Sequence, residues 1–221
     1  MQTRLVLIRH GEVEAAWRRR IYGSQDVPLS ELGMRQAKTA AAHLAATHLD
    51  VIVSSNLARA LYGARELGVD RKIDAFADAD LREIDRGRWV GKTIEQLNLG
   101  AYPSHANWSS NPSEVRPPGG ENLEDLARRV YSRLDHWASK YAGKTIGIVA
   151  HSWVIRVALC EAMGLHLNRA TNLQLGTGAI GVVDWSAGKR EGCASEARVA
   201  CLVGLGIRSM PPRTQWFVRP R

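Results

Sequence analysis

Short apolar runs alternate with longer segments of helical character along most of the chain. Three continuous apolar runs have the length of buried strands, at 5–8, 51–53 and 145–150. Helical patterns occupy four longer segments, at about 29–48, 57–67, 122–137 and 153–163. Strands that alternate with helices are typical of an α/β fold, in which helices cover a mostly parallel sheet.

The pattern also predicts where single elements begin and end. Asn122 is expected to cap the long helix, because Asp125 follows at the spacing of a capping box. One face of that helix should be buried, since apolar residues recur every three or four positions: Leu123, Leu126, Val130, Leu134 and Trp137. The helix at 57–67 is expected to stop at Gly68, the usual type of residue at a helix C-terminus.

The remaining segments complete the predicted domain. Residues 80–120 are interrupted by glycines and prolines and are expected to be irregular, whereas 178–184 and 197–203 are further strand candidates. No internal repeat or long linker divides the chain. We therefore predict one domain over residues 1–207 and an arginine- and proline-rich tail over 208–221.

Composition narrows the class of protein. The 221 residues are 45% hydrophobic and 24% charged, which is typical of a globular protein. No apolar run approaches the roughly 18 residues that span a membrane, and the first apolar stretch is too short for a signal peptide. We expect a cytoplasmic protein with no membrane partner. The three cysteines lack metal-site spacing, so reduced thiols are expected.

A formal net charge of +8 favours anionic partners, whether nucleic acid, a phosphorylated metabolite or an acidic surface. The cationic run at 18–20 has no aromatic-rich ribonucleoprotein motif beside it, so no nucleic-acid partner is expected.

Polar clusters follow three of the predicted strands. They are residues 9–11 (Arg-His-Gly), residues 54–55 (Ser-Ser) with Arg59 just beyond, and residues 151–152 (His-Ser). Because the carboxyl ends of parallel strands share one edge of a sheet, these clusters should lie together. Two histidines and two arginines at one edge suit a multiply charged anion.

Several other chemistries lack their motifs. The sequence has no His-x-x-x-His or His-Glu-x-x-His pair for a metal, no phosphate-binding loop of the Gly-x4-Gly-Lys-Ser/Thr type, and no Gly-x-Ser-x-Gly elbow. Taken alone, a histidine at a strand end, such as His10 or His151, is most often an ordinary hydrogen-bonded residue.

The combination of motifs resembles the histidine phosphatase superfamily, whose members share the phosphoglycerate-mutase-like fold. The matching segments occur in the family's order, at 7–12, 23–37, 54–60, 81–91, 118–122 and 149–156. This resemblance implies a three-layer α/β/α sandwich with a mostly parallel sheet, and a phosphomonoesterase that needs no metal or other cofactor.

The resemblance also implies residue roles. His10 would be the nucleophile that forms a phosphohistidine, and Glu83 would protonate the leaving alkoxide. Arg9, Arg59 and His151 would bind the phosphoryl oxygens and stabilise their charge, and Gly23 and Ser152 would line the substrate site. The alternative for Glu83 is a surface carboxylate that pairs with Arg82 or Arg86.

Some positions depart from the family pattern, namely Val13, Ala16, Asn56, Gly63, Val90 and Ser152. The loss of polar groups at Val13 and Ala16 could weaken phosphate binding. Because the five principal residues are intact, we predict an active enzyme with an atypical small phosphorylated substrate.

Among family members, the loops at 22–29 and 116–121 most resemble those of α-ribazole phosphatases. The alternatives are a phosphoglycerate mutase, a fructose-2,6-bisphosphatase-like enzyme, or a catalytically weak protein that binds phosphate or nucleic acid on the same fold. A homodimer is left open.

Overall fold

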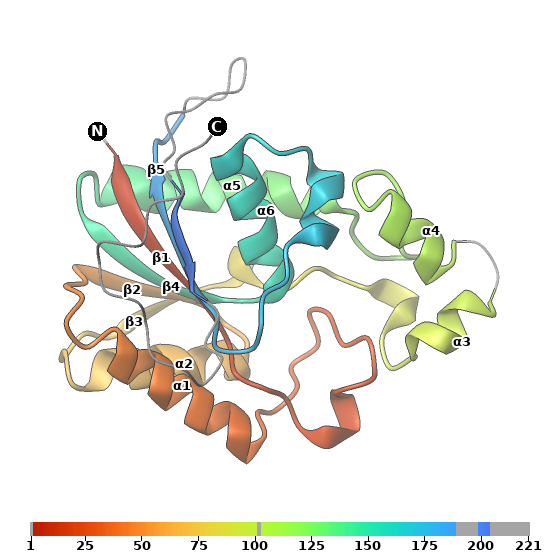
Figure 1. The fold of residues 1–221 in the computed structure, drawn as a ribbon, viewed down its shortest axis with the longest axis horizontal. Coiled ribbons are helices and arrows are strands. Elements are labelled where there is room, and N and C mark those ends of the chain that lie inside the picture. Colours follow the sequence, from red (N-terminus) through yellow and green to blue (C-terminus); the bar gives the residue numbers. More distant parts are fainter. Residues whose placement is uncertain (1, 101–102, 189–198, 204–221) are drawn as a thin grey trace.

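The computed structural model describes residues 2–100, 103–188 and 199–203. A six-stranded sheet forms its centre, in the order β3-β2-β4-β1-β5-β6 (Figure 1). The strands are β1 (Thr3–Arg9), β2 (Val51–Ser55), β3 (Ala75–Asp78), β4 (Thr145–Ala150), β5 (Ile180–Trp185) and β6 (Val199–Val203). The first four are mutually parallel, and β5 and β6 add an antiparallel edge. The predicted α/β fold is therefore confirmed.

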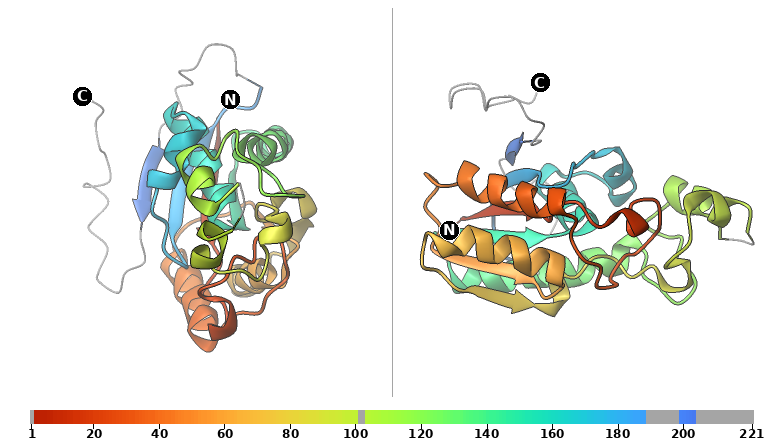
Figure 2. Two further views of the ribbon diagram at one scale, coloured as in Figure 1. Left: turned by 90° about the vertical axis from the view of Figure 1, so that its right-hand side faces the viewer. Right: turned by 90° about the horizontal axis from the view of Figure 1, so that it is seen from below.

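Helices cover both faces of the sheet and make the predicted three layers (Figure 2). The α-helices are α1 (Glu31–His43), α2 (Ala58–Val69), α3 (Ile94–Asn98), α4 (His105–Ser110), α5 (Leu123–Lys140) and α6 (Ser152–Met163). Short 3-10 turns occur at Ala15–Trp17, Ala79–Leu81, Gly87–Trp89 and Leu167–Asn172. Helices α5 and α6 pack on one face, and α1 and α2 pack on the other.

Alternate side chains of each strand enter the two cores. Leu5 and Leu7 of β1 join the core under α5 and α6, whereas Val6 and Ile8 join the core under α1 and α2. A strand that is buried on both faces reads as a continuous apolar run, because neither face meets water. This explains why the central strands show no polar alternation in the sequence.

The strand register brings the predicted polar clusters to one edge of the sheet. Arg9 at the end of β1 pairs with Ala150 at the end of β4. Ser54 near the end of β2 pairs with Val149. The residues that follow these three strands therefore start from neighbouring positions.

The long helix has the predicted cap and buried face. The Asn122 side chain accepts the backbone N–H of Asp125 at 2.9 Å, and the Asp125 carboxylate accepts that of Asn122 at 3.2 Å. The five predicted apolar side chains of this helix are all buried. The cap and the apolar stripe fix both the start of α5 and its orientation on the sheet.

The prediction for Gly68 was wrong, because α2 continues to Val69. A Cβ at Gly68 would lie 2.2 Å from the Ile73 carbonyl oxygen, so glycine is needed there for close packing of the returning chain. Helix α1 also ends at His43, before the predicted end near residue 48.

Residues 80–120 are more ordered than the sequence indicated. Helices α3 and α4 lie in this segment and extend beyond the carboxyl end of the parallel strands (Figure 1). Their Thr93 and Ser104 caps both form capping boxes, although each helix is too short to show clear periodicity. The strand β3, just before this segment, was not predicted.

The predicted tail at 208–221, and with it the domain boundary at 207, lies outside the described residues. Within the described ranges, no helix combines the length and the apolarity needed to cross a membrane.

Candidate active site

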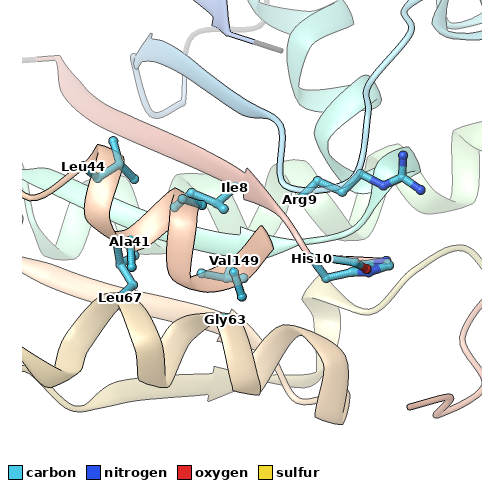
Figure 3. Close-up of a pocket in the computed structure, with 11 residues that line it drawn as sticks. Ile8, Arg9, His10, Ala41, Leu44, Gly63, Leu67 and Val149 are labelled. Carbon is cyan, nitrogen blue, oxygen red and sulfur yellow. The ribbon is translucent and has the colours of Figure 1, made fainter. Parts of the chain in front are cut away.

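Two buried histidine rings lie next to each other where β1 and β4 end. His10 follows β1 and His151 follows β4, and their ring centroids are 5.1 Å apart. Their exposed fractions are 2% and 0%. Figure 3 shows a small cavity whose lining includes Arg9 and His10, together with Ile8 of β1, Val149 of β4 and residues of α1 and α2.

The contacts of His10 fix the position of its ring proton. Nδ1 lies 2.7 Å from the Gly11 carbonyl oxygen, which can only accept a hydrogen bond. Nδ1 therefore carries the proton, and Nε2 keeps a lone pair. Burial, followed by the charges of Arg59 and Arg9, holds the pKa of His10 well below its usual 6.5. The ring is consequently neutral near pH 7.

Gly11 has a packing reason to be glycine. A Cβ at this position would lie 2.0 Å from the Gly33 carbonyl oxygen, in the turn that begins α1. The Arg-His-Gly sequence thus places the histidine at the end of β1 and lets α1 approach it closely.

His151 is neutral for similar reasons. Burial is the largest cause that lowers its pKa well below 6.5, and the charge of Arg59 adds to it. Nε2 lies 2.8 Å from the Ser55 hydroxyl oxygen. Nδ1 is buried and has no hydrogen-bond partner among the described residues.

Arg59 is held rigidly in the first turn of α2. Its two terminal nitrogens donate to the carbonyls of Gln25 at 2.7 Å and Gly23 at 2.8 Å. Gly23 has a φ of +45°, and a Cβ there would lie 2.6 Å from the Ile84 carbonyl oxygen. The sequence predicted Gly23 at the substrate site, and the structure places its carbonyl as an anchor for Arg59.

Arg9 approaches the same region from β1. One terminal nitrogen donates to the Leu175 carbonyl. The Nε atoms of Arg9 and Arg59 are both buried, and neither has a hydrogen-bond partner among the described residues.

Glu83 is buried, with an exposed fraction of 6%, so the surface alternative for this residue was wrong. Its carboxylate accepts the backbone N–H of Ile84 at 3.0 Å and that of Trp153 at 3.2 and 3.3 Å. Arg82 instead donates to the side chain of Asn56. Ser152 begins α6 between His151 and Trp153 and is buried as well.

Val13 has a structural role that explains its apolar character. It is buried and forms an isolated β-bridge with Leu29, whereas Ala16 is exposed in a short 3-10 turn. Neither side chain can donate a hydrogen bond to a phosphate.

The sequence analysis missed Tyr22 and a group of arginines and tryptophans. The Arg59 guanidinium lies 5.2 Å from the centroid of the half-buried Tyr22 ring, and burial is the main cause that raises the pKa of the phenol. Arg86, Trp108, Trp153 and Arg156 make further stacked contacts on the Glu83 side. The sequence pattern indicated these residues only weakly, because each is an isolated aromatic or basic residue within its own segment.

No group of three or more potential metal ligands occurs among the described residues.

An α/β sheet that collects buried histidines and arginines at one edge suits a protein that handles phosphoryl groups. Residues 5–193 match the model of the histidine phosphatase superfamily (branch 1). The chain belongs to this superfamily.

Relatives within the family have several names. Phosphoserine phosphatase 1 of Hydrogenobacter thermophilus is 33% identical over 167 residues, which cover 75% of this chain and 79% of that protein. A probable phosphoglycerate mutase of Yersinia pestis is 30% identical over 183 residues, covering 81% and 83%. A bifunctional protein of Mycobacterium tuberculosis is 35% identical over 178 residues, but the match covers only 49% of its length and 76% of this chain.

Solved structures agree with the fold. A mycobacterial glucosyl-3-phosphoglycerate phosphatase has a TM-score of 0.76 and 28% identity, over 83% of this chain and 91% of its own. The α-ribazole phosphatase of Shigella flexneri has a TM-score of 0.74 and 24% identity, covering 83% and 91%, which shows the shared fold alone.

Proposed function

We propose that this protein hydrolyses a small phosphomonoester through a phosphohistidine on His10. The observation that carries the proposal is the pair of neutral, buried histidine rings at the sheet edge that also holds Arg9 and Arg59. A neutral ring with a lone pair on Nε2 is ready to attack phosphorus, and the two arginines supply positive charge for the phosphoryl oxygens.

The number of unpartnered donors supports a bound phosphoryl group. Nε of Arg9, Nε of Arg59 and Nδ1 of His151 are all buried and lack a partner among the described residues. The Ser55 hydroxyl oxygen accepts the Leu57 amide at 3.3 Å, so its own hydrogen can go to Nε2 of His151. The proton of His151 then sits on Nδ1. Three such donors match the three non-bridging oxygens of a phosphoryl group.

The reaction has two steps in this proposal. Nε2 of His10 forms a bond to phosphorus while the bond to the ester oxygen breaks, and Glu83 gives its proton to the departing alkoxide. A water molecule then attacks the phosphorus, the P–N bond breaks, and Glu83 takes the proton from that water. Arg9, Arg59 and His151 hold the phosphoryl oxygens in both steps, and Gly23 contributes by holding Arg59.

Trp153 and Ile84 position the acid. Their backbone N–H groups bind the Glu83 carboxylate and orient it relative to the histidines. Ser152 belongs to the substrate site in this proposal because it lies in the turn between His151 and the amide that binds Glu83.

Hydrolysis is favoured over mutase chemistry. A mutase must keep water away from its phosphohistidine until an acceptor hydroxyl arrives. In the described residues between Glu83 and Gly120, the regular elements are the short helices α3 and α4 and a 3-10 turn at Gly87–Trp89. With 3-phosphoglycerate and a trace of 2,3-bisphosphoglycerate, we expect release of free phosphate to be faster than formation of 2-phosphoglycerate, and the reverse would favour a mutase.

Trapping the intermediate tests the proposal. Enzyme quenched during turnover of p-nitrophenyl phosphate should carry acid-labile, base-stable phosphate on His10. The His10→Ala variant should stay folded, carry no label and lose turnover, whereas His136→Ala, on the exposed side of α5, should behave as wild type. Label that persists in His10→Ala would contradict the covalent step.

A further inference from the structure

A buried arginine next to the acid has no role in the proposed reaction. Arg86 follows Glu83 by three residues and has an exposed fraction of 4%. Its guanidinium carbon lies 3.9 Å from the centroid of the Trp108 ring and 5.4 Å from that of Trp153. Its Nη1 is buried and finds no hydrogen-bond partner among the described residues.

A second arginine reaches the same tryptophan from α6. The guanidinium carbon of Arg156 lies 4.3 Å from the centroid of the Trp153 ring, and its buried Nε also lacks a partner among the described residues. The Trp108 and Trp153 rings meet edge to face, with centroids 4.8 Å apart. We call Arg86, Arg156, Trp108 and Trp153 the arginine–tryptophan cluster.

This cluster adjoins the phosphoryl site. The charge of Glu83 acts on both Arg86 and Arg156, and the charge of Arg9 acts on Arg156. The backbone of Trp153 binds the Glu83 carboxylate directly. A Cβ at Gly23, whose carbonyl anchors Arg59, would lie 2.8 Å from Cγ of Arg86.

The buried charge of Arg86 destabilises the folded protein when no ligand is bound. Burial lowers the pKa of Arg86 to about 10, so the group is still charged near pH 7. An ionised group that is buried without hydrogen bonds destabilises a protein unless a partner compensates it. Stacking on Trp108 uses the face of the guanidinium, and on its edge the buried Nη1 has no acceptor among the described residues.

Glu83 does not supply the missing acceptor. Its two oxygens bind the backbone amides of Ile84 and Trp153. In the proposed reaction Glu83 carries a proton when the substrate is bound, so it does not offset the charges of Arg86 and Arg156 at that stage. The two guanidinium groups, with Nη1 of Arg86 and Nε of Arg156 unpartnered among the described residues, suit a planar anion.

We propose that Arg86 and Arg156 bind a carboxylate of the substrate, so that the preferred substrates are phosphomonoesters of small hydroxy or amino acids. This inference rests on the proposed phosphatase function and names its substrate class. A planar carboxylate matches the planar donors of a stacked guanidinium in shape and in charge, whereas a second phosphate is tetrahedral.

Matched pairs of substrates test the inference. O-phosphoserine and O-phosphoethanolamine differ only in the carboxylate, and 3-phosphoglycerate and glycerol 3-phosphate differ by a carboxylate in place of a hydroxymethyl group. Wild-type enzyme should show a kcat/KM about tenfold to hundredfold higher for the carboxylate member of a pair, the range of a hydrogen bond to a charged group. In Arg86→Met this ratio should fall to about one, mainly because KM for the carboxylate member rises.

Two further variants separate ligand binding from folding. Arg88→Gln removes an exposed positive charge two residues away and should keep the wild-type ratio. Arg156→Gln should lower the ratio without changing the fold, and it provides the measurement if Arg86→Met does not fold. Because Arg86→Met removes a buried charge whose Nη1 has no hydrogen-bond partner among the described residues, its melting temperature should match or exceed that of wild type.

The outcomes distinguish this inference from the phosphatase function itself. If turnover of p-nitrophenyl phosphate does not depend on His10, the phosphatase proposal fails and the inference falls with it. If that turnover depends on His10 but no pair shows a preference, or the preference survives in both arginine variants, only the inference is wrong. A larger preference for fructose 1,6-bisphosphate over fructose 6-phosphate that is lost in Arg86→Met would assign the cluster to a second phosphate instead.

Discussion

Arg59 and Arg86 are both buried guanidinium groups, but the chain holds them in different ways. Arg59 donates to two backbone carbonyls and is fixed before any ligand arrives. Arg86 stacks on the Trp108 ring, and its Nη1 has no partner among the described residues. Groups that are fixed in advance stabilise a transition state at no cost of reorganisation, whereas a stacked group with free donors selects what it binds. We infer that the chemistry depends on Arg59 and the choice of substrate on Arg86.

The largest expected effect comes from Arg59→Met, which should break the phosphoryl site for every substrate. Loss of one charge-stabilising donor costs about 10²–10³-fold in kcat. The drop should be equal for p-nitrophenyl phosphate and for both members of each matched pair. Arg65→Met, on the exposed face of the same helix, is the control and should leave kcat unchanged. If Arg59→Met only raised KM, and only for one class of substrate, the assignment of the chemistry to Arg59 and of substrate choice to Arg86 would be contradicted.

A smaller effect is expected from the residue that anchors Arg59. Gly23→Ala places a Cβ in a left-handed backbone conformation and within 2.6 Å of the Ile84 carbonyl oxygen. We expect a loss of about 1–3 kcal/mol in the free energy of unfolding, together with a lower kcat because the Arg59 fork shifts.

The variant Gly91→Ala separates the effect of backbone strain from the effect of the steric clash with a neighbouring carbonyl. Gly91 has a φ of +83°, but a Cβ there would meet nothing within 4 Å. In denaturant unfolding, the free energy of unfolding of Gly91→Ala should therefore fall by the cost of backbone strain alone, with no added cost of a steric clash. The kcat of this variant should stay at the wild-type value. Equal losses of stability and of kcat in the two variants would mean that Gly23 has no specific link to Arg59.

The smallest effect concerns pH. The charge of Arg59 lowers the pKa of both His10 and His151, after burial as the main cause. Below pH 6.5 the unfolded chain binds protons on these histidines and the folded chain does not, so the free energy of unfolding falls as the pH falls. The slope is at most about 1.4 kcal/mol per pH unit for each histidine.

Arg59→Met should raise both pKa values and reduce this loss of stability between about pH 7.5 and 5.5. Arg86→Met should reduce this loss of stability less than Arg59→Met does, because the charge of Arg86 acts on the half-buried His105 rather than on His10 or His151. Denaturant titrations at several pH values measure the difference. If the free energy of unfolding falls as much in Arg59→Met as in wild type over this pH range, then the charge of Arg59 does not lower the pKa values of the two histidines.

The strand ends and the grouping of histidines at the sheet edge could be predicted because their signals are local. A central strand is an unbroken apolar run, and the residues that follow it must meet at the sheet edge once the strands are parallel. His10 and His151 are brought together by this rule alone, although 140 positions separate them.

The arginine–tryptophan cluster could not be predicted in the same way. Arg86 looks like a surface charge in the sequence, since nothing local indicates that Trp108 of α4 will cover it. The short helices α3 and α4 escaped for a related reason, because two turns or fewer carry no periodicity and their stability comes from tertiary packing. Strand β3 was missed because most of its side chains are not buried.

The hydrogen bond from the Trp153 amide to Glu83 has a mechanical consequence. His151 is the N-cap of α6 and Trp153 lies in the first turn of that helix. One helix therefore carries both the proposed hydrogen-bond donor to the phosphoryl group and the amide that binds the Glu83 carboxylate. Because both residues belong to the start of the same helix, a displacement of α6 as a rigid body would leave the spacing between the His151 ring and the Trp153 amide unchanged.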